Sequence, residues 1–193
     1  MIDRLGELAI RRPAIVRQTG AVASSSQGLA ELITDLASLD SAKVVIELGP
    51  GTGVFTEKIL EKIREHCIFF ALEINLRFVD ATRLRCPQCK VFHDSAAHAR
   101  KHLNALGIQH CDAVVSGLPW AAFPESVQDE ILDAVVDALT PGGTFVTFAY
   151  LHSVLLRRGK MFRKKLYSRF SQIERTPTVW RNMPPAFVYR AIR

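Results

Sequence analysis

Three glycines at alternating positions follow a short apolar run, and an acidic residue precedes them. The run Val44-Val-Ile-Glu47 leads into Gly49, Gly51 and Gly53. This pattern predicts a buried strand that ends in a tight turn and continues into a helix. Because glycine has no Cβ and adopts positive φ readily, such a turn lets a ligand approach the backbone closely. Glu47 is expected to place a fixed negative charge beside it.

Two further acidic residues end predicted strands. The apolar run from Cys67 ends at Glu73, and the run from Cys89 ends at Asp94. Dinucleotide-binding turns follow the pattern G-x-G-x-x-G, with an acidic residue about 20 residues further on. The chain departs from that pattern, because no third glycine lies three residues after Gly51 and the acid Glu47 precedes the turn.

The acid, the glycine turn and the two strand-end acids together resemble the class I S-adenosylmethionine (SAM) methyltransferases. The resemblance implies that Glu73 holds the ribose hydroxyls and that Asp94 lies at the adenine amino group. It implies SAM as the cofactor, with S-adenosylhomocysteine as the product. The residues it assigns to cofactor binding are Glu47, Gly49, Gly51, Thr52, Gly53, Glu73, Ile74, Asp94, Ser95 and Ser116.

The segment Ser116-Gly-Leu-Pro-Trp120 follows the fourth predicted strand. In an enzyme that methylates an amine, this position must hold the acceptor nitrogen in line with the methyl group and accept its hydrogen bonds. Pro119 predicts a stiff turn that aims backbone carbonyls inward. Trp120 offers a π-face to a cation, worth about 0.5–2 kcal/mol, or else packs in the core. The candidate catalytic residues are Ser116, Gly117, Leu118, Pro119, Trp120 and Tyr150.

Four segments resemble the bacterial phospholipid N-methyltransferase family. They are the Ser-Gly-Leu-Pro of residues 116–119, the lead-in Gly20-Ala-Val-Ala-Ser-Ser-Ser26, Phe148-Ala-Tyr150 and Trp180-Arg-Asn-Met-Pro-Pro-Ala186. The chain departs from the family at Ser24, where a proline is usual, and at Trp120, where an aliphatic residue is expected. Both departures bear on the substrate more than on the cofactor.

This second resemblance implies stepwise methylation of phosphatidylethanolamine by an enzyme that associates peripherally with an anionic membrane from the cytoplasm. Tyr150 is expected at the lipid phosphate or amine. The residues expected to contact the substrate or the membrane are Arg157, Arg158, Lys164, Lys165, Arg181 and Asn182. For Arg181 and Asn182, a surface turn before the last strand is the alternative interpretation.

Two other functions stay open. The ribosomal RNA adenine N6-dimethyltransferases share the glycine turn and a Leu-Pro-aromatic motif, but they open that motif with Asn and carry a C-terminal helical domain. The third interpretation is a protein that binds lipid or RNA on the same fold without catalysis. The net charge of +6 and the basic segment 157–170 suit lipid headgroups or nucleic-acid phosphates. The alternative interpretation of this segment is a solvated helix whose charges only aid solubility.

The elements that must position these residues alternate between strands and helices. Met1 to about Val16 is expected as an amphipathic helix, 19–26 as a loop, and Ser26 as the cap of the next helix. Further helices are expected at residues 27–39, 54–66, 75–85, 96–106 and 125–139 and in the basic segment, and strands at 43–48, 68–72, 90–93, 113–116, 144–149, 171–178 and 186–192. Pro141-Gly-Gly143 is expected to be a stop and turn.

This alternation predicts an α/β, Rossmann-like class I methyltransferase fold: a seven-stranded, mostly parallel sheet with helices on both faces. The length of 193 residues suits a single domain, with residues 1 to about 40 as a helical lead-in. No apolar run is long enough to span a membrane, and the charged N-terminus does not resemble a secretory signal. Cys86-Pro-Gln-Cys89 has the spacing of metal ligands, but two more ligands would have to converge on it, so no metal is expected.

Overall fold

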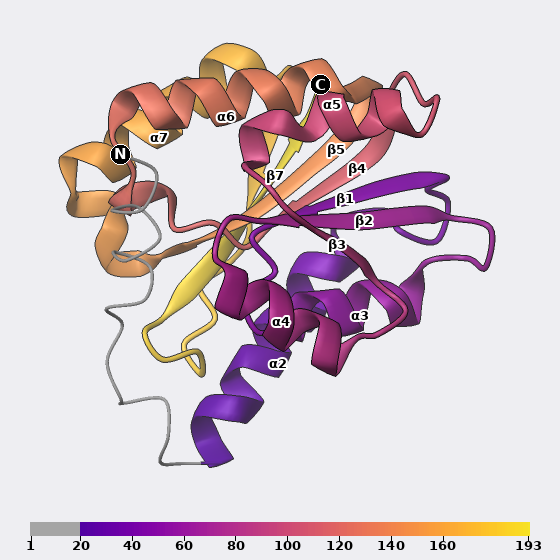
Figure 1. Cartoon of the computed structure of the whole chain (residues 1–193). Coiled ribbons are helices and arrows are strands. Elements are labelled where there is room, and N and C mark those ends of the chain that lie inside the picture. Colours follow the sequence, from indigo (N-terminus) through magenta and orange to yellow (C-terminus); the bar gives the residue numbers. More distant parts are fainter. Residues whose placement is uncertain (1–19) are drawn as a thin grey trace.

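The computed structural model describes residues 20–193, and in it one seven-stranded sheet runs through the molecule (Figure 1). The strand order is β3-β2-β1-β4-β5-β7-β6. The strands are β1 (Val44–Leu48), β2 (Ile68–Glu73), β3 (Lys90–His93), β4 (Cys111–Ser116), β5 (Leu139–Tyr150), β6 (Gln172–Arg175) and β7 (Ala186–Ile192). The first five are parallel neighbours, and β7 runs antiparallel to both β5 and β6. The predicted seven-stranded, mostly parallel sheet is therefore confirmed.

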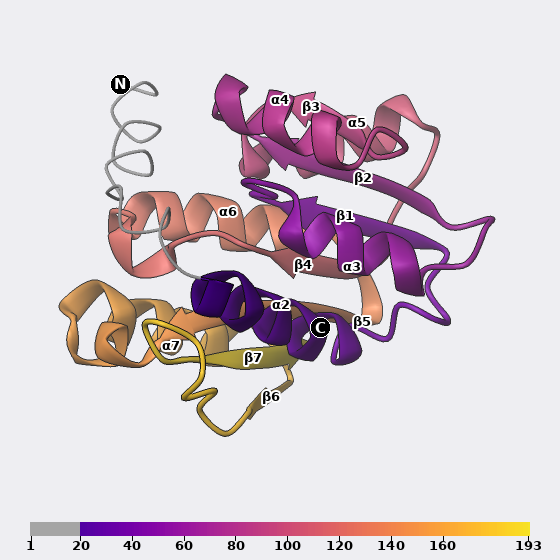
Figure 2. The same ribbon diagram turned by 90° about the horizontal axis from the view of Figure 1, so that it is seen from below.

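Helices cover both faces of this sheet (Figures 1 and 2). One face carries α2 (Gly20–Asp35), α3 (Val54–Lys62) and α4 (Leu76–Arg85); the other carries α5 (Ala99–Ala105), α6 (Glu125–Ala138) and α7 (Arg157–Arg169). The short 3₁₀ helices are η2 (Ala96–His98), η3 (Trp120–Ala122) and η4 (Leu151–Leu155). Since β1 to β5 are connected in chain order by helices and all run parallel, their carboxyl ends meet at one edge.

The core is divided by the sheet, because successive strand residues point to opposite faces. On β1, Ile46 packs toward α5, α6 and α7, whereas Val45 packs toward α2 and α3. A smaller cluster under α4 contains Val79, Cys86 and Cys89. The five residues of β1 are all buried, which accounts for its continuous apolar character.

Two local predictions were wrong. Helix α2 begins at Gly20, so residues 20–26 form its first turns rather than a loop, and Ser26 is not its cap. Ser24 occupies the position of the family's usual proline; without that proline, nothing in the sequence breaks the backbone hydrogen bonds of a helix there. The amphipathic helix expected over residues 1–16 lies outside the described residues.

The segment Pro141-Gly-Gly143 does not separate α6 from a later strand; it bulges out of β5. Cys111 of β4 pairs with Leu139, whereas Ala113 pairs with Thr144, so the residues between them on β5 are looped out. Gly142 has a φ of 79°, and its N–H donates to the carbonyl of Arg193 over 3.0 Å. Bulges accommodate proline and glycine within a strand. The stop and turn predicted at residues 141–143 is therefore wrong.

The last two strands form the expected edge hairpin, and it places its connecting loop at the carboxyl edge of the parallel strands (Figure 1). No helix in the described part of the chain has the length and apolarity needed to cross a bilayer.

Candidate active site

The glycine turn joins β1 to α3 and has the conformation that the sequence predicts. Gly49, Gly51 and Gly53 have φ values of 71°, 60° and 82°. Gly53 is the left-handed residue from which α3 begins. A Cβ on Gly51 would meet nothing within 4 Å, so the backbone of the turn borders open space. Side-chain-bearing residues would be strained at all three positions.

Glu73, the last residue of β2, points its carboxylate at this turn. Its Oε2 accepts a hydrogen bond from the Gly51 N–H over 3.2 Å, and its Oε1 accepts one from the Asn75 N–H over 2.9 Å. Burial raises its pKa, and these two hydrogen bonds oppose the rise. Each oxygen keeps a lone pair that can accept from a hydroxyl. The Glu73 carboxylate therefore lies beside the open space over Gly51, and its ribose role stays a prediction. The carbonyl of neighbouring Ile74 lies 2.9 Å from His93 Nε2.

Glu47 lies in β1, two residues before the glycine turn, and is fully buried. Thr56 Oγ1 donates to its Oε2 over 2.7 Å, while its Oε1 has no partner among the described residues. Burial raises the pKa of Glu47 to about 8, partly opposed by the Thr56 hydrogen bond and reinforced by Glu73. In contrast to the fixed negative charge expected from the sequence, burial favours the neutral form of Glu47, whose side chain bonds the start of α3 to β1.

Asp94 follows β3, and its carboxylate is held by the helix that follows it. Its Oδ1 accepts from Ser95 N over 2.8 Å and lies 2.6 Å from His98 Nδ1. Its Oδ2 lies 2.8 Å from Lys101 Nζ and 2.9 Å from His102 Nε2. Burial alone would raise the pKa of Asp94, but these partners hold it well below its usual range. An adenine amino group would have to share this carboxylate with three side chains, so the adenine role of Asp94 stays a prediction.

The loop after β4 touches the glycine turn backbone to backbone. Gly117 N–H donates to the carbonyl of Leu48 over 2.8 Å. A Cβ on Gly117 would overlap the carbonyl oxygen of Gly49, and a Cβ on Gly49 would lie 2.6 Å from Leu118 Cδ2. Ser116 is buried, and its Oγ accepts from Leu118 N over 3.3 Å. The two motifs that the sequence assigns to donor and acceptor are thus in direct contact.

Trp120 differs from the expected open cation platform. It is 3% exposed and stacks on Phe162, with ring centroids 4.5 Å apart and an interplanar angle of 18°. Its Nε1 donates to Thr147 Oγ1 over 2.9 Å. One π-face is therefore covered, and the indole is fixed as part of a wall. The alternative interpretation of Trp120 as a packing residue describes this arrangement better.

A cavity of about 200 Å³ lies between this loop and the segment after β5. One wall is formed by residues Leu118 to Ala122, and the other includes Phe148, Tyr150 and Leu156. Tyr150 stacks on His152 with ring centroids 5.6 Å apart. Most of the lining is apolar, with a few polar groups, which is the usual character of a small-ligand site.

Gln128 on α6 fixes this wall and was missed by sequence reasoning. Its Nε2 donates to the carbonyl of Trp120 over 2.9 Å and to the carbonyl of Arg158 over 3.1 Å. Arg158 Nη1 in turn donates to the carbonyl of Ala122 over 3.0 Å. Gln128 lies three and four residues before Ile131 and Leu132, on the buried face of α6. A polar residue on an apolar helical stripe was the available signal.

The basic segment forms α7, but its lysines do not all face outward. Lys165 is buried; its Nζ donates to Asp129 Oδ2 over 2.7 Å and to the carbonyl of Glu125 over 2.5 Å. Arg169 reaches Asp129 over 2.9 Å and Asp133 over 2.7 Å. The expectation that Lys165 contacts lipid is therefore wrong: it attaches α7 to α6. Arg157, Arg158 and Lys164 are exposed.

The loop between β6 and β7 contains two predicted contact residues, and only one of them is exposed. Arg181 is exposed, whereas Asn182 is buried. The Asn182 Nδ2 donates to the carbonyl of Pro184 over 2.7 Å, and its N–H donates to the carbonyl of Val179 over 3.2 Å. The Asn182 side chain therefore braces its own turn, as the alternative interpretation of this pair holds.

Cys86 and Cys89 pack in the apolar cluster under α4, and burial raises the pKa of both thiols. Cys86 Sγ contacts the carbonyl of Gly53 over 3.8 Å. Within residues 20–193, no three His, Cys, Asp or Glu side chains converge in a way that could hold a metal ion.

Comparison with known proteins gives one relative by sequence and many by structure. An ornithine lipid N-methyltransferase of Singulisphaera acidiphila is 30% identical over 172 residues, which cover 88% of this chain and 85% of that protein. No family model matches the chain.

Solved structures with the same fold include enzymes bound to SAM or S-adenosylhomocysteine. The N-methyltransferase NodS of Bradyrhizobium japonicum, in complex with S-adenosylhomocysteine, superposes with a TM-score of 0.69 at 16% identity, covering 100% of this chain and 96% of that chain. Magnesium protoporphyrin IX methyltransferase of Synechocystis, with bound SAM, gives 0.72 at 11% identity over 99% and 94%. The O-methyltransferase of Bacillus cereus gives 0.69 at 10% identity over 100% of both chains. The Rossmann-like methyltransferase fold is thereby confirmed.

Proposed function

The chain belongs to the class I SAM-dependent methyltransferases, in the family of the ornithine lipid N-methyltransferase, and we propose that it methylates the primary amine of a membrane aminolipid. Phosphatidylethanolamine is the acceptor that we put first, with the ornithine lipid headgroup as the second. The cofactor is SAM, which when bound supplies an electrophilic methyl group on a sulfonium.

One observation carries the acceptor assignment: the apolar cavity opens on the loop that contacts the glycine turn. Leu118 lines the cavity and also lies against Gly49. A ligand in the cavity is thus separated from the donor turn only by the loop of residues 116–119. The volume of the cavity and its mostly apolar lining suit the headgroup of an aminolipid.

The chain's own residues contribute positioning in this proposal. Glu73 and the glycine turn hold the nucleoside, with Thr52, Asp94 and Ser95 at its margin. The carbonyls of the Ser116–Pro119 loop orient the amine so that its lone pair points at the methyl group. Since the transfer is a direct displacement, holding both reactants in line provides much of the acceleration. Tyr150 and Arg181 are proposed to contact the headgroup.

The proposal places the enzyme at the cytoplasmic surface of the inner membrane as one domain of residues 1–193, with the lead-in of about 40 residues included. Arg157, Arg158 and Lys164, which are exposed on the first three turns of α7, are proposed to meet anionic headgroups.

The direct test offers labelled SAM to the purified enzyme together with vesicles of phosphatidylethanolamine, vesicles containing ornithine lipid, or ribosomal RNA. We expect label in an aminolipid. Label in RNA alone would contradict the lipid assignment, and a protein that binds SAM but labels neither lipid would be assigned a different acceptor.

A further inference from the structure

Four large apolar side chains are exposed to solvent on the two segments that follow β5 and precede β7. Leu155 is 75% exposed and Leu156 is 48% exposed, at the turn from η4 into α7. Trp180 is 72% exposed and Met183 is 78% exposed, in the loop between β6 and β7. Single exposed apolar residues are ordinary, but four on two adjoining loops at one edge form a patch of the kind that marks an interaction site.

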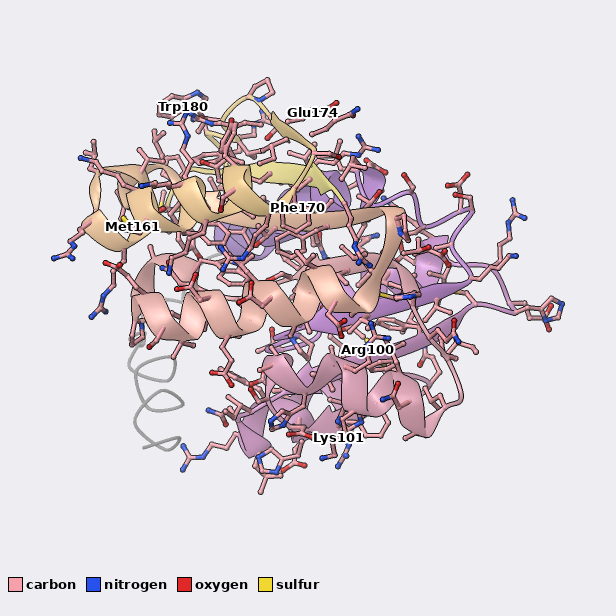
Figure 3. All side chains as sticks on the ribbon, turned by 90° about the horizontal axis from the view of Figure 1, so that it is seen from above. Arg100, Lys101, Met161, Phe170, Glu174 and Trp180 are labelled. Carbon is pink, nitrogen blue, oxygen red and sulfur yellow. The ribbon has the colours of Figure 1, made fainter. Side chains whose placement is uncertain are left out.

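The two loops are attached to each other. Leu151 N–H donates to the carbonyl of Pro185 over 2.8 Å, and β5 pairs with β7 up to Tyr150 and Ala186. Figure 3 shows Trp180 at the same end of the molecule as Met161, which lies in the first half of α7. The two loops therefore adjoin at their bases, and their four exposed apolar residues are called the rim below.

Exposed cations of α7 follow Leu155 and Leu156 directly in the sequence. From residue 151 to residue 171 the sequence contains no Asp or Glu. Lys165 and Arg169 point inward to α6, but Arg157, Lys160, Arg163 and Lys164 are exposed. Arg157 lies 3.4 Å from Glu125, with its side chain 86% exposed. Apolar side chains flanked by exposed cations match the boundary between the headgroups and acyl chains of an anionic bilayer.

The rim is also held rigidly to the cavity. A Cβ on Gly159 would overlap the carbonyl oxygen of Ser153, so η4 packs directly on the first turn of α7. Gln128 bonds both Trp120 and Arg158, which ties that turn to the acceptor loop. Leu156 belongs to both the rim and the cavity wall. Whatever covers the rim therefore meets the cavity mouth.

We infer that these two loops insert into the interface of an anionic bilayer, with Leu155, Leu156, Trp180 and Met183 as the inserted side chains. The inference rests on the proposed function and adds how the lipid reaches the site: the cavity mouth lies at headgroup depth, so that an aminolipid enters it from the bilayer. A second copy of this chain and an RNA are the other possible occupants of the patch, and both are distinguished below.

Trp180 reports insertion directly. The chain has two tryptophans, and Trp120 is 3% exposed, so an aqueous quencher addresses Trp180 selectively. With vesicles of phosphatidylethanolamine and phosphatidylglycerol, we expect a blue shift of the emission, protection from iodide, and quenching by lipids brominated along the acyl chain. Trp180→Phe should abolish all three signals. Trp180 that stays accessible to iodide while the protein sediments with vesicles would overturn the inference.

A double variant tests the energetics. Leu155→Ser with Met183→Ser should lower the partition coefficient onto these vesicles about 10- to 100-fold, because each apolar side chain transferred from water contributes about tenfold. Leu84→Ser is the matched control: Leu84 is 88% exposed near the carboxyl end of α4, remote from the rim, and its loss should leave partitioning unchanged. An equal effect of Leu84→Ser would overturn the assignment of the rim.

Methylation of a dispersed short-chain aminolipid separates this inference from the proposed function. The double variant should methylate it at the wild-type rate while losing activity on vesicles. Normal activity of the double variant on vesicles would contradict the insertion of the rim, while the proposed methylation of lipid would be unaffected. If the rim inserts into vesicles but the enzyme methylates no aminolipid, only the proposed function would be contradicted. Sedimentation as a dimer that the double variant abolishes, or RNA binding that it abolishes, would assign the patch to another occupant.

Discussion

The Nε2 of Gln128 lies 2.9 Å from the carbonyl oxygen of Trp120, so a buried amide on α6 fixes the loop that contacts the glycine turn. The same nitrogen reaches the carbonyl of Arg158 over 3.1 Å. A single side chain thereby joins the acceptor loop, α6 and the start of α7. Ile131 lies on the same buried face of α6 and makes apolar contacts in the core. Gln128 differs because its hydrogen bonds hold two carbonyls, and we therefore regard it as a positioning residue.

Gln128→Met should lower the free energy of unfolding by about 1–3 kcal/mol, because it removes two hydrogen bonds of a buried side chain while keeping the volume. It should also lower kcat more than it raises KM for SAM, since the glycine turn is untouched. Urea denaturation and steady-state kinetics measure the two effects. Gln172→Met, on the exposed surface of β6, is the control. Equal kcat in Gln128→Met and the wild type would remove its positioning role.

Glu73→Ala should weaken SAM binding by about 10- to 100-fold, as expected when hydrogen bonds to a charged acceptor are lost. Isothermal titration with S-adenosylhomocysteine measures this without turnover. Glu57→Ala is the control, because Glu57 is another acid near the turn but is ion-paired on the surface with Arg85. A dissociation constant for Glu73→Ala that matches the control would place the ribose elsewhere.

Glu47→Gln should alter how stability depends on pH. The folded-state pKa of Glu47 is raised from 4.5 to about 8. Between those two values the unfolded chain loses the proton and the folded chain keeps it, so wild-type stability falls as pH rises through that window. Each unit of pKa corresponds to roughly 1.4 kcal/mol, so Glu47→Gln should gain a few kcal/mol relative to wild type between pH 5 and pH 8.

Denaturation of both proteins at several pH values measures this difference, and the other titrating groups are common to both. Thr56→Val provides a second check, because it removes the one hydrogen bond to Glu47 Oε2 and should destabilise the fold by about 1–3 kcal/mol. Parallel pH profiles for the wild type and Glu47→Gln would show that Glu47 is ionised in the folded state.

Lys164 and Lys165 should have opposite roles although they are adjacent. Lys165→Met should lower stability by about 1–2 kcal/mol, less than for a fully buried pair, because Asp129 is partly exposed and keeps Arg169. It should leave vesicle binding unchanged. Lys164→Met should leave stability unchanged and weaken binding to anionic vesicles, more at low salt than at high salt. Thermal denaturation and cosedimentation distinguish them; the reversed pattern would contradict the orientation of α7.

The strands and the glycine turn were predictable because each has a local cause. Buried parallel strands are continuous apolar runs, and a left-handed turn needs glycine, as at Gly51 and Gly53. The acid Glu73 was placed correctly at the strand end facing that turn. The edge hairpin followed from two short strand patterns near the end of the chain.

The misses have tertiary causes. Cations are so frequent along α7 that its sequence does not show which of them faces inward. Lys165 faces inward because it pairs with Asp129 of α6. The partners of Asp94 could not be predicted either, because only the fold brings Lys101 and His102 of α5 to it, while its adenine role stays a prediction. The Pro141-Gly-Gly segment has the composition of a turn, and it becomes a bulge because the neighbouring strand and the carboxyl terminus pair on either side of it.

The contact between Gly49 and Gly117 has a consequence for how such an enzyme changes over evolution. The carbonyl oxygen of Gly49 occupies the space that a Cβ on Gly117 would need, so any side chain at position 117 would push the loop of residues 116–119 away from the glycine turn. We expect substitutions elsewhere in the cavity wall to change the preferred headgroup while these two segments stay in contact. Related enzymes would therefore differ in the headgroup that they accept before they differ in the reaction that they catalyse.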